Sequence, residues 1–540
     1  MLFNSLEFLL FLAVVYALYR VLSFRKQNIM LLAASYLFYG WWDWRFLFLM
    51  ILTTSVDFWS GLVIERGHLT RFQKLIPAAF LSAAGIFLVG FEVSAILATF
   101  TGAKSEAAFT SPLLPYVLLG IPIVLGTAGL FYRYVTTQPV ERRRKLVVTA
   151  SIIVQLSVLG FFKYFNFFSD SFAEAMGSLG FSVGRTTLDI ILPVGISFYT
   201  FQSMSYAIDV YRRELKPTDR YFDFALFVSF FPQLVAGPIE RAKNLLPQFT
   251  LPRSVTADQF RRGCFLIMFG LFKKVAIADG LAPTVDQAYA IPDPSWGTVV
   301  VGTIAFALQI YCDFSGYSDI ARGVAKLFGI ELMYNFNQPY FSRSPREFWQ
   351  RWHISLSTWL SDYLYKPLGG NRGSLAFNCR NLMLTMILGG LWHGAAWNYV
   401  LWGFYHGTIL SLHRIMLTIR GSAHDNAVMA LAKMAGFGIL TLYGWLLFRA
   451  RSFDQVATMT STLLTGHGGL AFEAARPALS ALLGVIVLIA WEITQYRHAG
   501  DAKFYRAYPI PLVGLAVAVM VFLTLMGTSN EPAQFIYFQF

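Results

Sequence analysis

The 540 residues of the chain are 56% hydrophobic and only 14% charged, and the mean hydropathy is +0.53. A soluble chain of this length with that composition would aggregate, which excludes a water-soluble protein and makes lipid the solvent. The basic residues behind the net charge of +13 cluster between apolar segments, which indicates cytoplasmic loops and anionic lipid headgroups rather than nucleic acid. The three cysteines show neither pairing nor metal-ligand spacing, so we expect no disulfide framework and no metal.

Apolar segments follow one another through the first 220 residues, and most are long enough to span ~30 Å of hydrocarbon. The first run, to about Leu22, lacks a basic leader and a cleavage site, so we interpret it as a retained helix. We expect membrane helices near residues 6–22, 28–41, 46–63, 76–99, 113–132, 146–167 and 188–208.

Lysine and arginine alternate in number between these segments, with three, one, three, one, five, one and four in successive loops. Cytoplasmic loops of membrane proteins carry the excess of these residues. The alternation therefore predicts seven crossings, a periplasmic N-terminus and a cytoplasmic loop at residues 212–220.

Beyond residue 220 the apolar stretch 222–238 is interrupted by Pro232 and by Gly237-Pro238. Broken helices at membrane depth usually line a cavity, so this stretch is predicted to be re-entrant. Clearer spans return near 297–312, 381–397, 399–417, 427–448, 477–494 and 509–527. The fold class is therefore an all-α integral membrane bundle, with N-terminal helices at 1–220, a core at 221–420 and C-terminal helices at 421–540.

A helix with one aromatic face is predicted from residue 345 onward. Ser344 suits the N-cap, Pro345 the first helical position, and Glu347 completes a capping box. Helical spacing places His353 on a buried face, where a histidine hydrogen-bonded inside the bundle is the structural alternative to a functional one. The other members of that face are Trp349, Trp352, Leu356, Trp359, Leu360 and Tyr363.

His393 lies in an apolar run beside glycines 389, 390 and 394, which allow a backbone or a substrate to approach closely. An ionisable side chain at membrane depth is costly, and desolvation keeps an imidazole neutral and able to accept a proton. His393 is therefore a candidate general base. Asp313 and Asp319 are candidates for orienting an imidazole, with pairing to Arg322 or capping of a helix start as alternatives.

His406 and His413, seven residues apart, share one helical face. This spacing fits a structural hydrogen-bond ladder or the wall of a polar channel. We favour the structural interpretation for both.

The sequence resembles the membrane-bound O-acyltransferase superfamily, and within it the alginate O-acetyltransferase branch of bacterial polysaccharide-modifying proteins. The resemblance covers most of the chain in order and rests on residues 192–212, 231–239, 311–319, 351–353, 392–394 and 535–540. It implies about a dozen transmembrane and re-entrant helices around a central cavity or tunnel, in a bacterial inner membrane. The superfamily histidine maps to His393, and the second histidine of this branch maps to His353.

The resemblance also implies a reaction. A cytosolic acyl thioester such as acetyl-CoA meets an acceptor hydroxyl from the outer side, without a metal or a permanently bound cofactor. A periplasmic acetyltransferase partner and polysaccharide machinery are expected to complete delivery. Because a thioester is already activated, the protein must mainly align the reactants, remove the acceptor proton and stabilise the oxyanion. His393 would act as the base, and His353 would position the reactants or stabilise the developing charge. Trp392 and Gly394 would lie near the oxyanion.

Basic residues near the predicted re-entrant region are candidates for a donor entrance that attracts the phosphates of coenzyme A. The alternative is that they are ordinary positive-inside anchors. They are Lys273, Lys274, Arg212, Arg213, Arg241 and Lys243.

Two other functions stay open at this point. Broken helices and buried His and Asp residues also mark channels and secondary transporters of small polar solutes, although no inverted repeat is found. D-alanyl transfer to a teichoic acid would use the same tunnel architecture with a carrier-protein donor. The longer C-terminal extension and the ending at 535–540 favour the polysaccharide acetylation branch.

Overall fold

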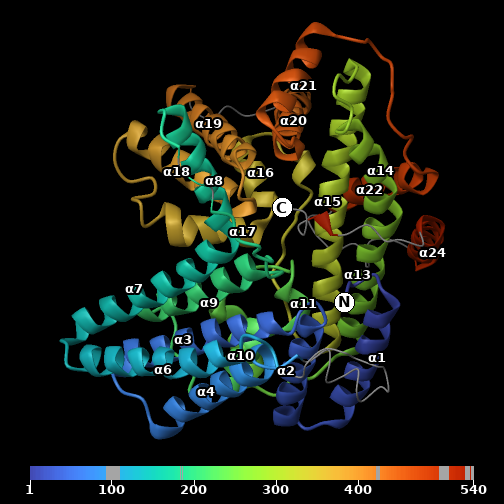
Figure 1. Ribbon diagram of the computed structural model, residues 1–540. Helices are drawn as coiled ribbons and strands as arrows, with labels where there is room; N and C mark the ends of the chain where they lie inside the picture. Colours follow the sequence, from blue (N-terminus) through green and yellow to red (C-terminus); the bar gives the residue numbers. More distant parts are fainter. Residues whose placement is uncertain are drawn as a thin grey trace. The chain divides into compact units, whose positions relative to one another are not determined.

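The computed structural model describes residues 1–92, 110–182, 184, 186–420, 426–497, 510–528 and 535–536, and that part of the chain is helical (Figure 1). Its only extended pairing is an isolated antiparallel bridge between Phe91 and Thr110. Lys104 and Arg185, each the single basic residue of its predicted loop, lie outside the described residues, as do residues 537–540.

The chain divides into two compact units. The first comprises Met1–Thr256 and Ala325–Leu332, and the second comprises Ala257–Val324 and Met333–Phe540. These units are defined by packing alone, whereas the three predicted segments were defined by function. The division into 1–220, 221–420 and 421–540 therefore stays a prediction.

The first unit contains the predicted N-terminal helices. Most predicted segments correspond to one helix, and the sixth continues through a π-helical turn into α8, a 39-residue run from Val140 to Ser178. The elements are α1 (Leu6–Val21), α2 (Phe24–Gly40), α3 (Arg45–Arg66), α4 (Arg71–Ala84), η1 (Gly85–Val89), α6 (Leu114–Thr136), α7 (Val140–Leu159), η2 (Gly160–Tyr164), α8 (Phe165–Ser178), α9 (Ile196–Tyr211), α10 (Tyr221–Ser229), α11 (Phe231–Leu234) and α12 (Ala242–Thr250).

Two boundaries in the first unit follow from proline and glycine. Helix α9 begins only at Ile196, because Pro193 disfavours a helical residue before it and Gly195 has φ of 74°. The predicted interruption of residues 222–238 is confirmed, since α10 ends at Ser229 and the four-residue α11 follows with Pro232 in its first turn.

The second unit contains the remaining elements. They are α13 (Ala257–Leu271), η3 (Phe272–Ala278), α14 (Asp279–Ala288), α15 (Trp296–Leu327, whose last three residues belong to the first unit), η4 (Pro339–Phe341), α16 (Pro345–Arg351), α17 (Ile354–Leu360), η5 (Ser361–Tyr365), α18 (Leu375–His393), α19 (Trp397–Arg420), α20 (Ala427–Arg449), α21 (Phe453–Thr465), α22 (Leu479–Arg497) and α24 (Ile510–Gly527). Helix α15 has 32 residues and continues well past the predicted end at 312. Asp313 and Asp319 therefore lie inside a helix, and the capping alternative is wrong.

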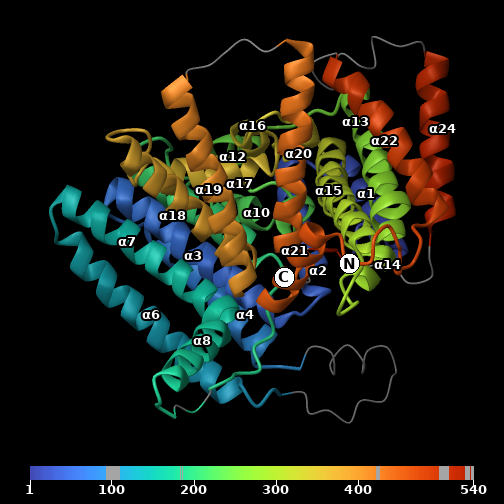
Figure 2. The ribbon, with the colours of Figure 1, turned by 90° about the horizontal axis from the view of Figure 1, so that it is seen from above.

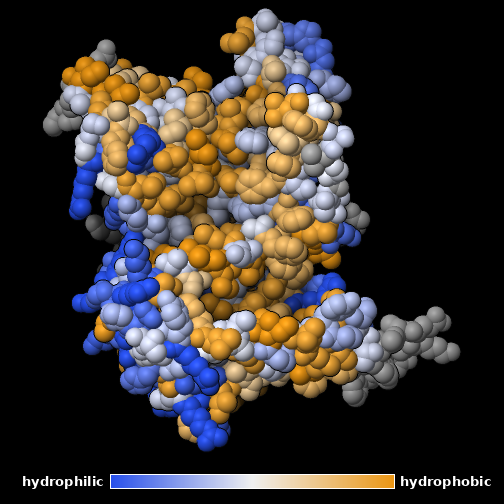
Figure 3. All heavy atoms as spheres, turned by 60° about the vertical axis from the view of Figure 1, so that its left-hand side comes forward, coloured by the Kyte–Doolittle hydropathy of each residue, from blue (hydrophilic) through white to orange (hydrophobic). Residues whose placement is uncertain are grey.

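Seven helical runs of the described chain are long and apolar enough to cross a membrane. Helix α6 presents apolar side chains such as Leu119 and Leu130 outward, with 66% and 67% of their surface exposed, which fits lipid as the solvent. Hydrophobic residues also cover much of the face drawn in Figure 3. The seven runs are Arg45–Arg66, Arg71–Val89, Leu114–Thr136, Val140–Ser178, Trp296–Leu327, Ala427–Arg449 and Leu479–Tyr496.

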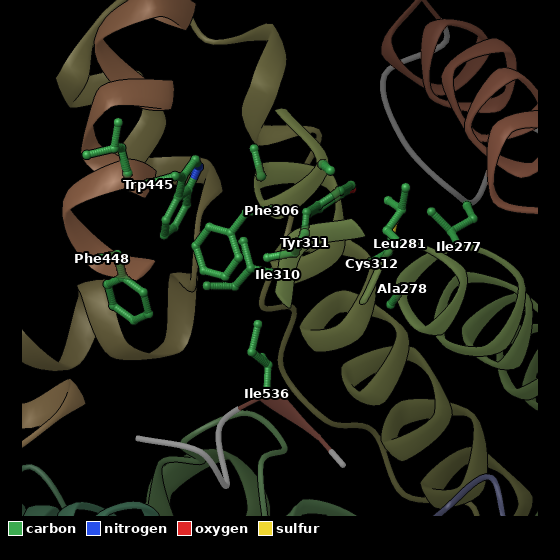
Figure 4. Close-up of a cluster of buried hydrophobic side chains, with 14 of the residues drawn as sticks. Ile277, Ala278, Leu281, Phe306, Ile310, Tyr311, Cys312, Trp445, Phe448 and Ile536 are labelled. Carbon is green, nitrogen blue, oxygen red and sulfur yellow. The ribbon is translucent and has the colours of Figure 1, made fainter. Parts of the chain in front are cut away.

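The core of the second unit is rich in aromatic side chains from α15 and α20. Phe306 and Tyr311 of α15 and Trp445 and Phe448 of α20 are at most 4% exposed (Figure 4). Ile536, from the end of the chain, belongs to the same core. The same core includes Trp352, which precedes His353, and Trp402 of α19.

Candidate functional site

The predicted continuous helix over residues 345–363 is wrong, because it breaks at Trp352 and His353. Helix α16 begins as expected, with the Ser344 hydroxyl accepting from the Glu347 N–H. It ends at Arg351. Trp352 is extended, and His353 adopts a left-handed backbone with φ of 42° before α17 starts.

Hydrogen bonds from residues 335–337 explain this break. The Ile354 N–H donates to the Asn335 carbonyl at 2.9 Å, and the Asn337 N–H donates to the Arg351 carbonyl at 3.0 Å. These tertiary bonds replace the helical bonds that a continuous helix would form. They hold His353 at a turn between two short helices.

The Asn335 side chain reinforces the same turn. Its Oδ1 accepts from the Ser355 hydroxyl at 2.6 Å, and its Nδ2 donates to Ser318 Oγ on α15 at 3.0 Å. All three side chains are buried. Sequence reasoning missed Asn335, which lies in a connecting segment without periodicity.

His353 is fully buried, as predicted, and is surrounded by aromatic rings. The Phe314 ring meets it edge to face with centroids 4.7 Å apart, and the Trp392 centroid lies 6.0 Å away. His353 lies outside the long apolar spans, and burial lowers the pKa of its imidazole to about 3. The ring is therefore neutral at physiological pH.

His393 is the last residue of α18 and faces the same region. Its ring centroid lies 6.5 Å from that of His353, so the structure brings the two predicted histidines together. Trp392, Trp402 and Phe448 approach the His393 ring with centroid distances of 5.1, 5.1 and 5.4 Å.

Glycines beside His393 allow α19 to pack closely on α18 (Figure 2). A Cβ at Gly390 would lie 2.1 Å from the Tyr399 carbonyl oxygen and 3.1 Å from the Gly403 backbone. A Cβ at Gly394 would lie 2.1 Å from the Tyr399 ring. Of the two predicted explanations for these glycines, close backbone approach is confirmed at Gly390.

Asp319 takes part in an ion-pair cluster on α15. Its carboxylate lies 2.6 Å from Lys273 Nζ and 3.1 Å from Arg322 Nη1. The predicted alternative of pairing with Arg322 is confirmed. Lys273 also donates to Ser315 Oγ at 2.9 Å.

Asp313 joins the end of the chain to the middle of α15. Its carboxylate lies 2.7 Å from Lys274 Nζ and accepts from the Ile536 N–H at 2.6 Å. Lys274 also pairs with Asp279 at 2.8 Å. Support of an imidazole by Asp313 or Asp319 stays a prediction.

Lys273 and Lys274 are buried instead of exposed as we expected of a donor entrance, and their role in donor binding stays a prediction. Both belong to the π-helix η3 and are only 3% and 8% exposed. Their ammonium groups are neutralised by the carboxylates above, which is what burial of a charge requires. Arg212 and Arg213 follow the end of α9 in the first unit, where Arg213 is exposed and pairs with Glu141, and their role stays a prediction.

Two further side chains outside the predicted set contribute to the surroundings. Phe535 packs on Phe314 and Tyr317, with ring centroids 6.2 and 4.9 Å apart, and Phe314 in turn contacts His353. Glu492 of α22 is buried and accepts a short hydrogen bond from the Tyr311 hydroxyl. A single carboxyl in an apolar helix was a signal that sequence reasoning passed over.

His406 is buried in an aromatic enclosure instead of a hydrogen-bond ladder. Phe348 stacks on it with an interplanar angle of 8°, and Trp402 lies 4.6 Å away between His406 and His393. Its Nδ1 has no hydrogen-bond partner among the described residues. His413, further along α19, is only partly buried.

The described residues contain no group of three or more His, Cys, Asp or Glu side chains placed to hold a metal ion. The fold and the site thus define a helical membrane protein that buries a pair of histidines among aromatic rings. Such an arrangement suits general-base chemistry in a water-poor environment.

Comparison with known families identifies the class of this protein. The MBOAT, membrane-bound O-acyltransferase family model matches residues 154–451, a range that includes His353 and His393. The chain belongs to this family and is a multi-pass membrane acyltransferase. Glu492 and Phe535 lie beyond the matched range.

Curated relatives with different names are similar to this chain. The probable alginate O-acetylase of Azotobacter vinelandii is 37% identical over the full length of both chains. The peptidoglycan O-acetyltransferase of Helicobacter pylori is 36% identical over 64% of this chain and 71% of its own. The teichoic acid D-alanyltransferase of Streptococcus thermophilus is 30% identical over 40% of this chain and 55% of its own.

Proposed function

We propose that the protein transfers an acetyl group from a cytosolic thioester donor, acetyl-CoA, for O-acetylation of an exopolysaccharide of the alginate or cellulose type. The observation that carries this proposal is the buried pair of His353 and His393, with ring centroids 6.5 Å apart, inside the family-matched range. The full-length similarity to a probable alginate O-acetylase supports the acetyl group and the polysaccharide acceptor.

His393 acts as the general base in this proposal. Its imidazole takes the proton of an acceptor hydroxyl as the oxygen attacks the acetyl carbonyl carbon, and the carbon–sulfur bond then breaks to release the thiolate. The proton on His393 passes to that thiolate, so the imidazole ends neutral. His353 positions the acceptor hydroxyl or the acetyl carbonyl. Trp392 or the backbone near Gly394 stabilises the oxyanion.

The orientation and partners of the protein are part of the same proposal. The chain lies in a bacterial inner membrane with a periplasmic N-terminus, so that donor and acceptor reach the site from opposite sides. A periplasmic acetyltransferase partner and polysaccharide machinery complete delivery to the polymer. The family membership removes the channel or transporter alternative, and D-alanyl transfer remains the competing acyl transfer.

The test compares His393→Ala with wild type in cells that make the polymer and in isolated membranes supplied with radiolabelled acetyl-CoA. We expect the variant to insert and to be recovered at the wild-type level, because the change removes little packing. Polymer acetylation and donor turnover should fall by roughly 10²–10⁴-fold, the contribution of a general base. Acetylation near the wild-type level would exclude His393 as the base.

Two controls show whether a loss of acetylation is specific to His393 and to the acetyl donor. His413→Gln changes a partly buried histidine on α19 and is expected to keep wild-type activity. Supplying a D-alanyl carrier protein instead of acetyl-CoA distinguishes the two acyl donors, since transfer from the carrier alone would contradict the proposed donor.

A further inference from the structure

A second buried polar cluster lies in the first unit, among three helices that pack on one another: α3, α7 and α9 (Figure 1). Its centre is Asp57, halfway along the apolar helix α3 and fully buried. Ser151 Oγ lies 2.5 Å from Asp57 Oδ1, and Gln155 Nε2 lies 2.6 Å from Asp57 Oδ2. The proposed acetyl transfer uses none of these residues.

The hydrogen bonds around Asp57 favour its ionised form. The Gln155 amide donates to one carboxylate oxygen, so a proton on that oxygen would face another hydrogen. Ser151 supplies a hydroxyl to the other oxygen. Hydrogen bonds to both oxygens of a carboxylate stabilise the charge.

No basic side chain among the described residues neutralises this charge. The ion pairs of the unit involve other carboxylates, and all the hydrogen-bond partners of Asp57 are uncharged. An isolated carboxylate in an apolar helix bundle is strongly unfavourable, and an ionisable residue at membrane depth is by default functional. A positive charge is therefore expected beside Asp57.

The Gln155 amide nitrogen has three oxygen partners in this cluster. Gln155 Nε2 lies 3.1 Å from Ser203 Oγ and 3.3 Å from the Thr53 carbonyl oxygen, in addition to Asp57. Gln155 is fully buried, and its Oε1 has no hydrogen-bond partner in the described structure. Helices α3 and α9 thus direct three oxygen atoms toward one point, where the Gln155 amide nitrogen of α7 now stands.

We propose that Asp57, Gln155, Ser203 and the Thr53 carbonyl form a binding site for a monovalent cation, with sodium as the ion. Carboxylate, carbonyl and hydroxyl oxygens are the ligands that hard cations prefer. The two ends of the Gln155 amide are nearly the same in shape, so a half-turn brings Oε1 toward the other oxygens. Such a cluster of oxygens is stable only with a cation between them. The single carboxylate matches one positive charge, which favours a monovalent over a divalent ion.

The experiment measures the unfolding temperature of the purified full-length protein in NaCl, KCl and choline chloride at equal ionic strength. A ligand that binds only the folded state raises stability with the logarithm of its concentration. We expect a rise with sodium that choline does not reproduce. Asp57→Asn keeps the size of the side chain but removes the charge, and is expected to lose the sodium response.

Matched variants and a direct assay complete the test. Asp43→Asn, which removes a carboxylate paired with Arg45 just before the start of α3, should keep the sodium response. Ser203→Ala removes one neutral oxygen and should raise the half-saturating sodium concentration about tenfold. Equilibrium binding of radioactive sodium to the wild type should be saturable and competed by unlabelled NaCl.

Several outcomes would overturn the proposal. Equal unfolding temperatures in sodium and choline, together with no saturable sodium binding, would mean that Asp57 is protonated and only holds the helices together. A sodium response that persists in Asp57→Asn would place the ion elsewhere. A potassium response larger than the sodium response would contradict the choice of ion.

Discussion

Asn335 offers the sharpest test of how the structure positions His353. Alanine at this position removes the acceptor of the Ser355 hydroxyl, 2.6 Å away, and the donor to Ser318 Oγ, 3.0 Å away. Removing one partner of a buried hydrogen bond costs about 1–3 kcal/mol, so the loss of both bonds amounts to roughly 2–6 kcal/mol at this turn. The backbone bond between Ile354 and the Asn335 carbonyl remains, because it does not use the side chain.

We therefore expect Asn335→Ala to loosen the turn around His353 without preventing membrane insertion. Loss of about 1.4–2.7 kcal/mol of positioning corresponds to a decrease of roughly 10–100-fold in the rate of acetyl transfer. The assay is donor turnover in membranes, with kcat and KM determined separately, because a positioning residue should lower kcat more than it raises KM. Hydrogen exchange of the peptide that covers residues 352–357 should increase in parallel.

A matched control distinguishes positioning from general destabilisation. Asn381→Ala also removes a buried asparagine of the second unit, but its Nδ2 donates to the Gly370 carbonyl and not to the His353 turn. Wild-type kcat and unchanged hydrogen exchange in Asn335→Ala would refute the positioning role. An equal loss of kcat in the two variants would show that stability alone is responsible.

Two more substitutions test the packing and the charges of the second unit. In Gly390→Ala, the new methyl group would overlap the Tyr399 carbonyl oxygen, so α19 must move away from α18, and we expect a loss of about 1–3 kcal/mol in stability, measured as a lower unfolding temperature, with reduced acetyl transfer. In Lys274→Met, the carboxylates of Asp279 and Asp313 lose their cation, which should lower the free energy of unfolding by about 3–5 kcal/mol. We expect the yield of folded protein, measured by size-exclusion chromatography, to fall sharply. A normal yield with only a raised KM for the donor would restore the surface interpretation of this lysine.

The helical membrane fold could be predicted from the apolar segments, because crossing a bilayer requires long apolar runs that stand out in the sequence. The break at His353 could not. Helical periodicity over 345–363 is strong, but hydrogen bonds from Asn335 and Asn337 replace the helical ones, and nothing in the local pattern indicates that these asparagines lie there. Tertiary hydrogen bonds therefore outweighed the local helical preference of this segment.

The candidate site was predicted in part. Burial of His353 and its proximity to His393 follow the expectation from apolar surroundings and from the family resemblance. The surroundings of Lys273 and Lys274 were misjudged, since sequence cannot show that carboxylates from α14 and α15 meet their ammonium groups. By contrast, Asp57 is an isolated carboxyl in an apolar span, a signal that the sequence does carry.

The left-handed backbone of His353 has a consequence for engineering this enzyme. A residue other than glycine in that conformation carries roughly 1–2 kcal/mol of backbone strain. Any selection for heat resistance that acts through the backbone would favour glycine at this position, and glycine has no imidazole. At residue 353, selection for thermal stability would therefore favour glycine, whereas selection for activity would keep histidine.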